Sequence, residues 1–256
     1  MDLQLKDRVY LLTGATRGLG RATAEALVAD GARVVVSGRD AAAVEATVAA
    51  LGGDGSARGV VADNADPGTP AALLGAAQDA WGRVDGVLIS VGGPPAGLIT
   101  EMTDEQWTAA FGTVFLGAVR LAREVGAVLG ASPDGGSIAF VLSTSVREPI
   151  IDLAISNGLR PGLAMAAKTL ADELGPCGVR VNGLLPGRIG TERVAQLDAA
   201  RGDAERARAE MSAQIPLRRY GLPEEFGRVA AFLLSPAASY LSGVMLPVDG
   251  GLLRPL

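Results

Sequence analysis

Short apolar, β-branched runs alternate with alanine-rich stretches along the whole of this 256-residue chain. The apolar runs predict strands at Val9–Leu12, Arg33–Val36, Gly59–Ala62, Gly86–Ser90, Ser137–Leu142, Val179–Leu185 and Val244–Val248. The stretches between them predict helices at Gly18–Ala29, Ala41–Leu51, Thr69–Trp81, Asp104–Leu129, Leu153–Leu174 and Pro223–Leu234. Strands that are apolar throughout are typical of a parallel sheet buried on both faces. The alternation therefore predicts an α/β fold with one doubly wound parallel sheet, and a single domain over residues 1–256.

Two segments depart from this alternation. Residues 187–215 carry charged stretches such as ERARAE, and we interpret them as an inserted helical segment or lid. Val229–Val248 is an uncharged run long enough to span a bilayer on paper. Because it contains Pro236, Gly243 and several hydroxyl-bearing residues, we predict a helix, a turn and a strand there, and no membrane span.

Composition excludes several classes of function. The formal net charge of −5 argues against a nucleic-acid or anionic-membrane partner. The chain contains no histidine, which removes histidine-based acid–base catalysis, histidine-dependent triads and nearly all zinc chemistry, so we expect no metal site. The single Cys177 cannot form an intrachain disulfide, and we expect it to pack near a helix end. With no apolar signal segment at the N-terminus, we expect a cytoplasmic protein.

A glycine-rich turn follows the first predicted strand directly. Thr13–Gly20 reads TGATRGLG and leads into the first predicted helix. Glycines in this position let the backbone approach a pyrophosphate, which then binds the free N–H groups at the helix N-terminus. Such a turn also occurs for packing reasons alone, but its place between a strand and a helix favours a dinucleotide site.

The end of the second predicted strand bears on which dinucleotide binds. A site for NAD normally places an acidic side chain there to hold the ribose 2′-hydroxyl, whereas this chain has Gly38 followed by Arg39. Arg17 lies within the glycine-rich turn itself. Two guanidinium groups without a carboxylate favour a 2′-phosphate, and so NADP(H) over NAD(H), although both could instead be solvated surface arginines. Asp40 is expected to cap the next helix.

With these motifs the chain resembles the short-chain dehydrogenase/reductase family over nearly its whole length. Further matches are RVN at Arg180–Asn182, PGRIGT at Pro186–Thr191 and the tail LPEEFGRVAAFLLS…SGVMLPVDGG, which is similar to the 3-oxoacyl-carrier-protein-reductase-like branch. The resemblance implies a Rossmann-type fold, a nicotinamide cofactor, a small carbonyl or alcohol substrate, and a homotetramer or homodimer. The tetramer's four-helix faces would come from Asp104–Leu129 and Leu153–Leu174.

The resemblance also implies which residues surround the cofactor. Asp63 would lie against the adenine, and Pro186, Gly187 and Thr191 near the nicotinamide, with residues 187–215 on the substrate side. The cofactor-binding set expected from the turn and the resemblance together is Gly14, Thr16, Arg17, Gly18, Leu19, Gly20, Gly38, Arg39, Asp63, Asn64, Gly92, Pro186, Gly187 and Thr191.

The family's catalytic residues are a Ser, a Tyr and a Lys with a supporting Asn, and this chain departs from that pattern. The Tyr and Lys positions, counted back from LADELGPCGVRVN, hold Ser156 and Arg160 in the stretch ISNGLRPG. The supporting Asn is replaced by Val114, and the family's NNAG turn reads ISVG, with Ser90 at the structural Asn. Ser143 matches the catalytic Ser, with Ser145 as a nearby alternative. The chain is similar to a divergent branch that carries SN…R in place of the Tyr and Lys.

No other residue is an obvious proton donor. The only tyrosines are Tyr10, Tyr220 and Tyr240, and we expect all three to serve packing. Glu148 and Asp152 could act as carboxylic acids if buried, but loop residues of this kind are more often solvated. Arg188 is a further polar candidate near the predicted pocket.

Three hypotheses follow. The first is an NADP(H)-dependent oxidoreductase of the carbonyl reductase or alcohol dehydrogenase type, with Ser143, Ser156 and Arg160 as candidate catalytic residues and an atypical proton source. The second is a non-catalytic NADP(H)-binding sensor or assembly protein. The third is a lyase or isomerase without net redox chemistry. The intact nucleotide-binding end favours the first.

Overall fold

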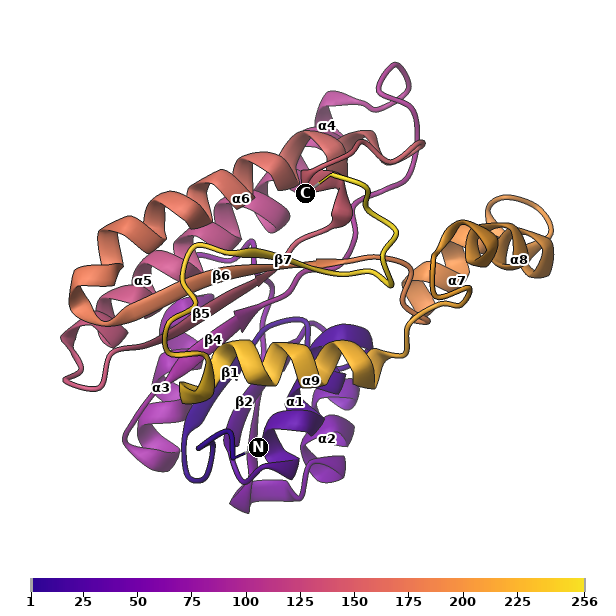
Figure 1. Ribbon diagram of the computed structural model, residues 1–256. Helices are drawn as coiled ribbons and strands as arrows, with labels where there is room; N and C mark the ends of the chain where they lie inside the picture. The colour runs from indigo at the N-terminus through magenta and orange to yellow at the C-terminus, as the bar shows by residue number, and fades with distance from the viewer. Residues whose placement is uncertain (1, 256) are drawn as a thin grey trace.

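The computed structural model describes residues 2–255, and its seven strands form one parallel sheet in the order β3-β2-β1-β4-β5-β6-β7 (Figure 1). The strands are β1 (Val9–Leu12), β2 (Arg33–Gly38), β3 (Ala57–Val61), β4 (Gly86–Ile89), β5 (Gly136–Val141), β6 (Val179–Pro186) and β7 (Met245–Val248). Every predicted strand is present, and each end differs from its prediction by two residues at most. The predicted fold class, a single-domain Rossmann-type α/β fold, is confirmed.

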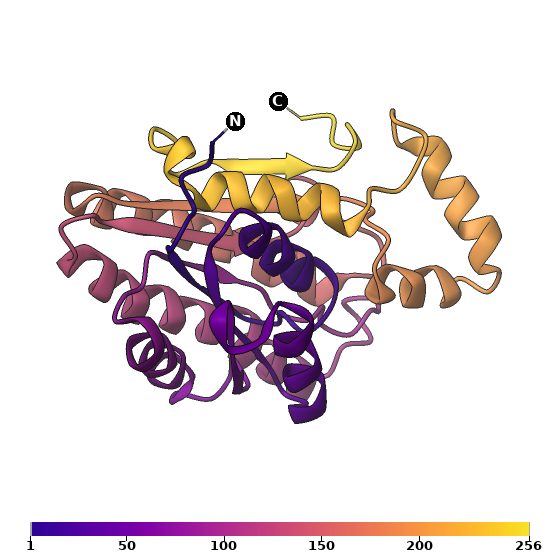
Figure 2. The same cartoon turned by 90° about the horizontal axis from the view of Figure 1, so that it is seen from below.

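Helices cover both faces of the sheet. One face is covered by α1 (Gly18–Ala29), α2 (Ala41–Ala50) and α9 (Pro223–Leu234), and Figures 1 and 2 show α9 beside α1. The other face is covered by α3 (Thr69–Trp81), α5 (Gly117–Ala131) and α6 (Ala154–Leu174). Consecutive strand residues enter opposite cores: Leu11 packs with the second group of helices and Leu12 with the first. This double burial is why the strands are apolar throughout rather than alternating.

The predicted helix Asp104–Leu129 is wrong in one respect, because it is not a single α-helix. It consists of α4 (Asp104–Ala110), a π-helical stretch at Phe111–Leu116, and α5. Gly117, where α5 begins, packs directly against the backbone of Asn64, and a side chain there would collide with the Asn64 carbonyl group. Wider π turns of this kind are frequent at functional sites, and Thr113 and Val114 from this one line the main cavity.

Residues 187–215 form two helices that project from the body of the protein, as both ribbon views show (Figures 1 and 2). They are α7 (Glu192–Ala199) and α8 (Ala204–Gln214). Each begins with a side-chain cap: Thr191 accepts a hydrogen bond from the Val194 N–H, and Asp203 accepts one from the Arg206 N–H. The predicted insertion is therefore helical.

Residues Val229–Val248 divide into the end of α9, a short 3₁₀ turn at Pro236–Ala238 and β7, as predicted. Within residues 2–255, no helix combines the length and the apolar character that a membrane span requires. Cys177 closes a 3₁₀ turn just after α6 and is exposed.

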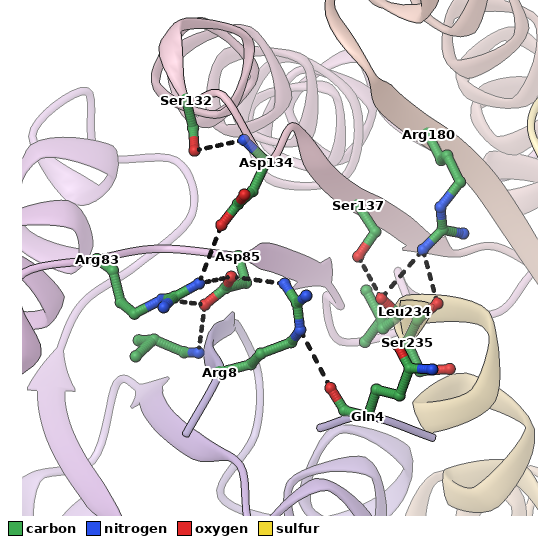
Figure 3. A network of polar contacts seen from close by, with 11 residues as sticks. Gln4, Arg8, Arg83, Asp85, Ser132, Asp134, Ser137, Arg180, Leu234 and Ser235 are labelled. Carbon is green, nitrogen blue, oxygen red and sulfur yellow. Dashed lines mark hydrogen bonds and ion pairs between the residues drawn. The ribbon is translucent and has the colours of Figure 1, made fainter. Parts of the chain in front are cut away.

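At the amino-terminal ends of the strands, arginines and aspartates form a network of hydrogen bonds and ion pairs (Figure 3). The buried Asp85 carboxylate accepts hydrogen bonds from the Val9 N–H at 2.8 Å, from Arg8 at 2.9 Å and from Arg83 at 2.6 and 2.9 Å. Arg180 on β6 donates to the carbonyl groups that end α9, at Leu233, Leu234 and Ser235. Cations at the end of a helix satisfy its free carbonyl groups, so Arg180 of the RVN motif is structural.

The strand order reverses between β1 and β4. Hydrogen bonds among Thr13, Asn64 and Ser90, which we call the clasp, join the two strands there. The Thr13 hydroxyl donates to the Ser90 carbonyl at 2.7 Å and accepts from the Ser90 N–H at 2.9 Å. The Asn64 side chain donates to the Thr13 hydroxyl and to the Ser90 carbonyl, both at 3.3 Å. Connections leave β1 and β4 in opposite directions, so a crevice opens at this point of the sheet.

We predict that Thr13→Val destabilises the protein by about 1–3 kcal/mol, because it leaves the buried Ser90 N–H without an acceptor while keeping the shape of the side chain. Urea unfolding measures the change. Thr169→Val is the matched control, since the Thr169 hydroxyl bonds only the Met165 carbonyl within an exposed helical turn, and it should change stability by less than about 0.5 kcal/mol. Equal effects of the two variants would contradict this role of the clasp.

Candidate functional site

One cavity of about 1710 Å³ opens at the carboxyl ends of the strands, where the sheet order reverses. Its walls come from the glycine-rich turn after β1, the ends of β2 and β3, the loops after β4 and β5, the start of α6, and α7. Every residue of the predicted cofactor-binding set lines this cavity. The side chain of Asn64 is engaged in hydrogen bonds with Thr13 and Ser90. Sequence elements far apart in the chain therefore form one continuous site.

The glycine-rich turn forms a backbone cradle. Gly14 and Gly18 adopt φ angles of +56° and +55°, a left-handed conformation that other residues rarely adopt. A Cβ atom on Gly20 would lie 2.6 Å from the Gly14 carbonyl oxygen, so α1 can begin this close to β1 only with glycine there. Arg17 precedes α1 without any side-chain cap on the helix's free N–H groups. Those groups are left to bind an anion.

The end of β2 excludes an acidic side chain. A Cβ atom on Gly38 would lie 2.7 Å from the Thr16 methyl group, which fills the space that a carboxylate would need. Arg39 lies 3.9 Å from Asp63, and Arg17 forms a 2.7 Å ion pair with Glu192; all four residues border the cavity. Both guanidinium groups are largely exposed, and so remain accessible to a ligand.

The opposite wall of the cavity contains the remaining predicted cofactor residues. Thr191 faces the glycine-rich turn, because its methyl group lies 3.6 Å from where a Gly18 Cβ would be. Gly92 and Pro186 also line the cavity, and no atom lies within 4 Å of where a Gly92 Cβ would be; Leu19 lines the cavity from the glycine-rich turn itself. Gly187 lines it too, but its lack of a side chain is explained by packing, since a Cβ there would lie 2.7 Å from the Asp249 side chain.

The stretch ISNGLRPG begins α6, and each of its polar side chains has a partner of its own. The Ser156 hydroxyl lies 3.2 Å from that of Ser145, and both are buried. Asn157 donates to the Ile150 carbonyl at 2.8 Å and accepts from the Ile150 N–H at 3.0 Å, which fixes the loop after β5. Arg160 donates to the Val141 carbonyl at 2.7 Å, at the end of β5. This stretch therefore joins α6 to β5 and its loop.

The two candidate serines differ in whether they line the cavity. Ser143 lines the cavity and uses its side-chain oxygen as an acceptor for the Ser145 N–H at 3.1 Å, so its own hydroxyl proton is free for a ligand. Ser145 is buried against Ser156 and does not line the cavity. Ser143, Ser156 and Arg160 all line the cavity, as does the buried Val114.

Arg160 is a buried cation without an acidic partner. Burial, and secondarily the positive charge of Arg193, lowers the pKa of Arg160 to about 10, so its guanidinium group is still protonated at pH 7. Burial also lowers the pKa of Arg193, which donates to the Pro94 carbonyl at 2.5 Å. A protonated guanidinium in the wall of the cavity that Ser143 also lines could stabilise negative charge that develops on a ligand oxygen.

The tyrosines lie outside the cavity wall. Tyr10 is buried in β1, and burial raises its pKa far above the usual value. Tyr240 is fully exposed. Tyr220 is buried and donates to Asp198, and burial raises its pKa as well, with the charge of Asp198 as the next cause. Tyr10 and Tyr220 therefore serve packing, as predicted. The same prediction is wrong for Tyr240, because its side chain is exposed.

The carboxylates proposed as proton donors are both exposed. Glu148 borders the main cavity, whereas Asp152 borders only a smaller adjoining cavity of about 350 Å³. Within residues 2–255, no group of three metal-ligating side chains is placed to hold an ion.

Sequence reasoning missed a buried group at the base of the projecting helices. Asp198 on α7 lies 3.4 Å from Arg188 and accepts a hydrogen bond from Tyr220 at 3.2 Å. Arg208 on α8 lies over the Tyr220 ring at 4.7 Å. The group joins α7, α8 and the segment before α9. No motif in the sequence marks Asp198, which lies near the C-terminal end of α7.

A parallel Rossmann-type sheet with a glycine cradle at its point of reversal is the architecture of dinucleotide-binding proteins. The family model described as enoyl-(acyl carrier protein) reductase matches residues 14–253, so the chain belongs to this family of short-chain dehydrogenases/reductases.

Individual relatives cover the whole chain. It is 36% identical to a Streptomyces virginiae protein named for a ketoacyl reductase of the monensin polyketide synthase, with 97% of this chain and 98% of the relative covered. It is 34% identical to L-rhamnose 1-dehydrogenase (NAD(P)(+)) of Azotobacter vinelandii, with 97% of both covered. Among solved structures, L-sorbose reductase from Gluconobacter frateurii, complexed with NADPH and L-sorbose, matches with a TM-score of 0.93 at 28% identity over 100% of both chains.

We predict that Asp198→Ala loosens the projecting helices, because it leaves Arg188 and the Tyr220 hydroxyl buried without their partner. Removing one member of a buried pair costs about 3 kcal/mol or more. Limited trypsin digestion should cleave residues 187–215 faster than in the wild type. Glu205→Ala, at an exposed position of α8, is the control and should digest at the wild-type rate; the same rate for Asp198→Ala would contradict the role assigned to this group.

Proposed function

We propose that this protein is an NADP(H)-dependent oxidoreductase that interconverts a small carbonyl compound and its alcohol. The observation that carries the proposal is the continuity of one cavity, from the glycine cradle after β1 to Ser143 and Arg160 at the start of α6. A nicotinamide cofactor bound at the cradle would reach the substrate end within the same space. The relatives are named as reductases and dehydrogenases, which supports the same class of reaction.

The residues of the cradle fit a dinucleotide. Gly14, Gly18 and Gly20 leave room for a pyrophosphate against the backbone, and the uncapped N-terminus of α1 offers N–H donors to it. In this proposal Asp63 binds the adenine side, whereas Gly92, Pro186, Gly187 and Thr191 border the nicotinamide. The solved relative with NADPH bound supports the choice of cofactor.

The phosphorylated cofactor is favoured by charge. Arg17 and Arg39 are both exposed at the cavity edge, and Gly38 leaves no acidic side chain to repel a 2′-phosphate or to hold a 2′-hydroxyl. Guanidinium groups bind phosphate oxygens through paired N–H donors. Their present partners, Glu192 and Asp63, are themselves solvated, so exchanging them for a phosphate costs little.

The catalytic end departs from the family's Ser–Tyr–Lys–Asn pattern, and we propose an atypical active site. When bound, NADPH would supply the hydride for reduction of the carbonyl carbon. Arg160 stabilises the negative charge that develops on the carbonyl oxygen, and the Ser143 hydroxyl donates a hydrogen bond to the same oxygen. Ser156 is a positioning residue, because its hydroxyl is engaged with Ser145. Water in the open cavity supplies the proton that completes the alcohol.

The projecting helices and the exposed apolar surface fit two further parts of the proposal. Residues 187–215 form a substrate-side lid, since α7 lines the cavity. The protein assembles as a homotetramer or homodimer in the cytoplasm through α4, α5 and α6. Val128 on α5, Met165 on α6, and Phe111 and Leu116 on the π-helical stretch between α4 and α5 are exposed apolar side chains, and covering them would stabilise the assembly.

We predict that calorimetric titration finds tighter binding of NADPH than of NADH. Arg39→Gln should weaken NADPH binding about tenfold, because it removes one charged contact with the 2′-phosphate, and should leave NADH binding unchanged. Arg254→Gln, which removes a charge from another part of the cavity wall, is the control. Equal loss of affinity for both cofactors in Arg39→Gln would contradict the 2′-phosphate assignment.

We predict that Ser143→Ala and Arg160→Met each lower kcat by about 10²-fold or more, as expected when a donor to a developing oxyanion is removed. Loss of NADPH absorbance with a carbonyl panel measures the effect. Ser145→Ala should lower kcat less, since Ser145 acts only through its neighbours. If both main variants kept full activity, the mechanism would be wrong. If no carbonyl compound were reduced while NADPH bound tightly, the protein would be a nucleotide-binding sensor instead.

A further inference from the structure

The wall of the main cavity is rich in arginine, although the protein as a whole is acidic. The cavity wall contains eight arginines and four carboxylates, although the whole chain has a formal net charge of −5. Arg17 and Arg39 belong to the proposed cofactor end, and Arg188 is neutralised by Asp198. Of the other five arginines, Arg201, Arg218 and Arg254 are exposed, which leaves the buried Arg160 and the partly buried Arg193. Within residues 2–255, neither has a carboxylate within ion-pair distance.

Arg193 is built into its position. It lies on the first turn of α7 and donates to the carbonyl of Pro94 across the cavity. Its guanidinium group crosses Gly93 so closely that a Cβ on that glycine would lie 2.6 Å from the Arg193 Nε atom. The turn GGPP at residues 92–95 therefore does two things: Gly93 leaves room for the guanidinium group, and Pro94 holds it with a carbonyl oxygen.

Arg160 and Arg193 also interact with each other. Each has one neutral carbonyl partner, Val141 for Arg160 and Pro94 for Arg193, and the charge of Arg193 acts on Arg160. Two like charges in a partly dehydrated wall repel, and a carbonyl group offsets only part of that cost. An anion between the two guanidinium groups would relieve the repulsion and accept their remaining N–H donors.

We propose that the substrate carries an anionic group near its carbonyl, and that Arg193 binds this group while Arg160 faces the carbonyl oxygen. This inference rests on the proposed reductase function of the same cavity. An oxo acid fits the arrangement, with its carboxylate on Arg193; a phosphorylated ketone shares the chemistry that a guanidinium fork recognises. The anionic group is unchanged in the reaction, and only the carbonyl accepts a hydride and a proton.

Matched pairs of ligands test the proposal with the full-length protein. The pairs are pyruvate, acetoacetate and phenylglyoxylate with their methyl esters, and dihydroxyacetone phosphate with dihydroxyacetone. Turnover is followed by loss of NADPH absorbance, and binding is measured by calorimetry on protein saturated with NADP⁺, where no reduction occurs. We expect the anionic member of at least one pair to be favoured about tenfold or more in kcat/KM or in affinity.

Arg193→Met should bring this preference close to one, and Arg193→Lys should keep part of it. Gly93→Ala should weaken the preference without removing any charge, because the new methyl group displaces the guanidinium group. All three variants should bind NADPH with wild-type affinity. Arg206→Met, which removes an exposed arginine of α8 that pairs with Glu210, is the matched control and should keep the preference.

The outcomes separate this proposal from the proposed function. Equal preference for esters and acids in the wild type, no binding of any anionic ligand, or an unchanged preference in Arg193→Met would overturn it. Loss of NADPH affinity in Arg193→Met would also overturn it, because the anion would then be the cofactor's own phosphate. Anionic ligands that bind but are never reduced would support this site while refuting the reductase function. A preference confined to the phosphorylated ketone would identify the anion as a phosphate.

Discussion

The pairing of Thr13 with Ser90 is the contact on which the rest of the site depends. It lies where the sheet reverses its order, so it joins two strands whose connections run in opposite directions. The same hydroxyl and carbonyl groups also accept the Asn64 side chain, and the Asn64 backbone lies against Gly117 of α5. Three parts of the cavity wall are thus fixed through one buried clasp. A crevice held in this way keeps its shape without side chains to fill it.

Buried arginines have different kinds of partner in different parts of the molecule. At the amino-terminal edge, Arg8 and Arg83 share the Asp85 carboxylate (Figure 3), and under α7 the Asp198 carboxylate neutralises Arg188. These charges have partners because they serve the fold, and an unpaired buried ion there would destabilise it. Arg180 has no carboxylate partner either, but it satisfies three carbonyl groups at the end of α9, whereas Arg160 and Arg193 in the cavity wall each face a single neutral carbonyl group. One carbonyl group leaves most N–H donors of Arg160 and of Arg193 available, which supports a ligand as the source of negative charge at these two positions.

The fold was predictable from the sequence because burial of both faces of the sheet makes the strands apolar throughout. Such strands stand out from the helical stretches that alternate with them at regular intervals. The glycine cradle was predictable for a related reason: a left-handed φ at Gly14 and Gly18 restricts the choice of residue. The π-helical stretch at Phe111–Leu116 was not, because its sequence suits an α-helix; the close contact of Gly117 with the Asn64 backbone directly after it is a tertiary feature that no local pattern predicts. Asp198 and the crossing of Arg193 over Gly93 depend on which segments meet in space, and no local pattern records that.

The stretch ISNGLRPG shows why replaced catalytic residues do not by themselves mean a lost function. If the substitutions had only removed a proton donor, the new side chains would have no reason to be ordered. Ser156, Asn157 and Arg160 instead each contact a different part of β5 or the loop that follows it. Arg160 in particular places a buried positive charge in the cavity, where a neutral side chain would be easier to accommodate. The free-energy cost of burying this guanidinium group is better explained by an anion or an oxyanion that binds beside it than by packing.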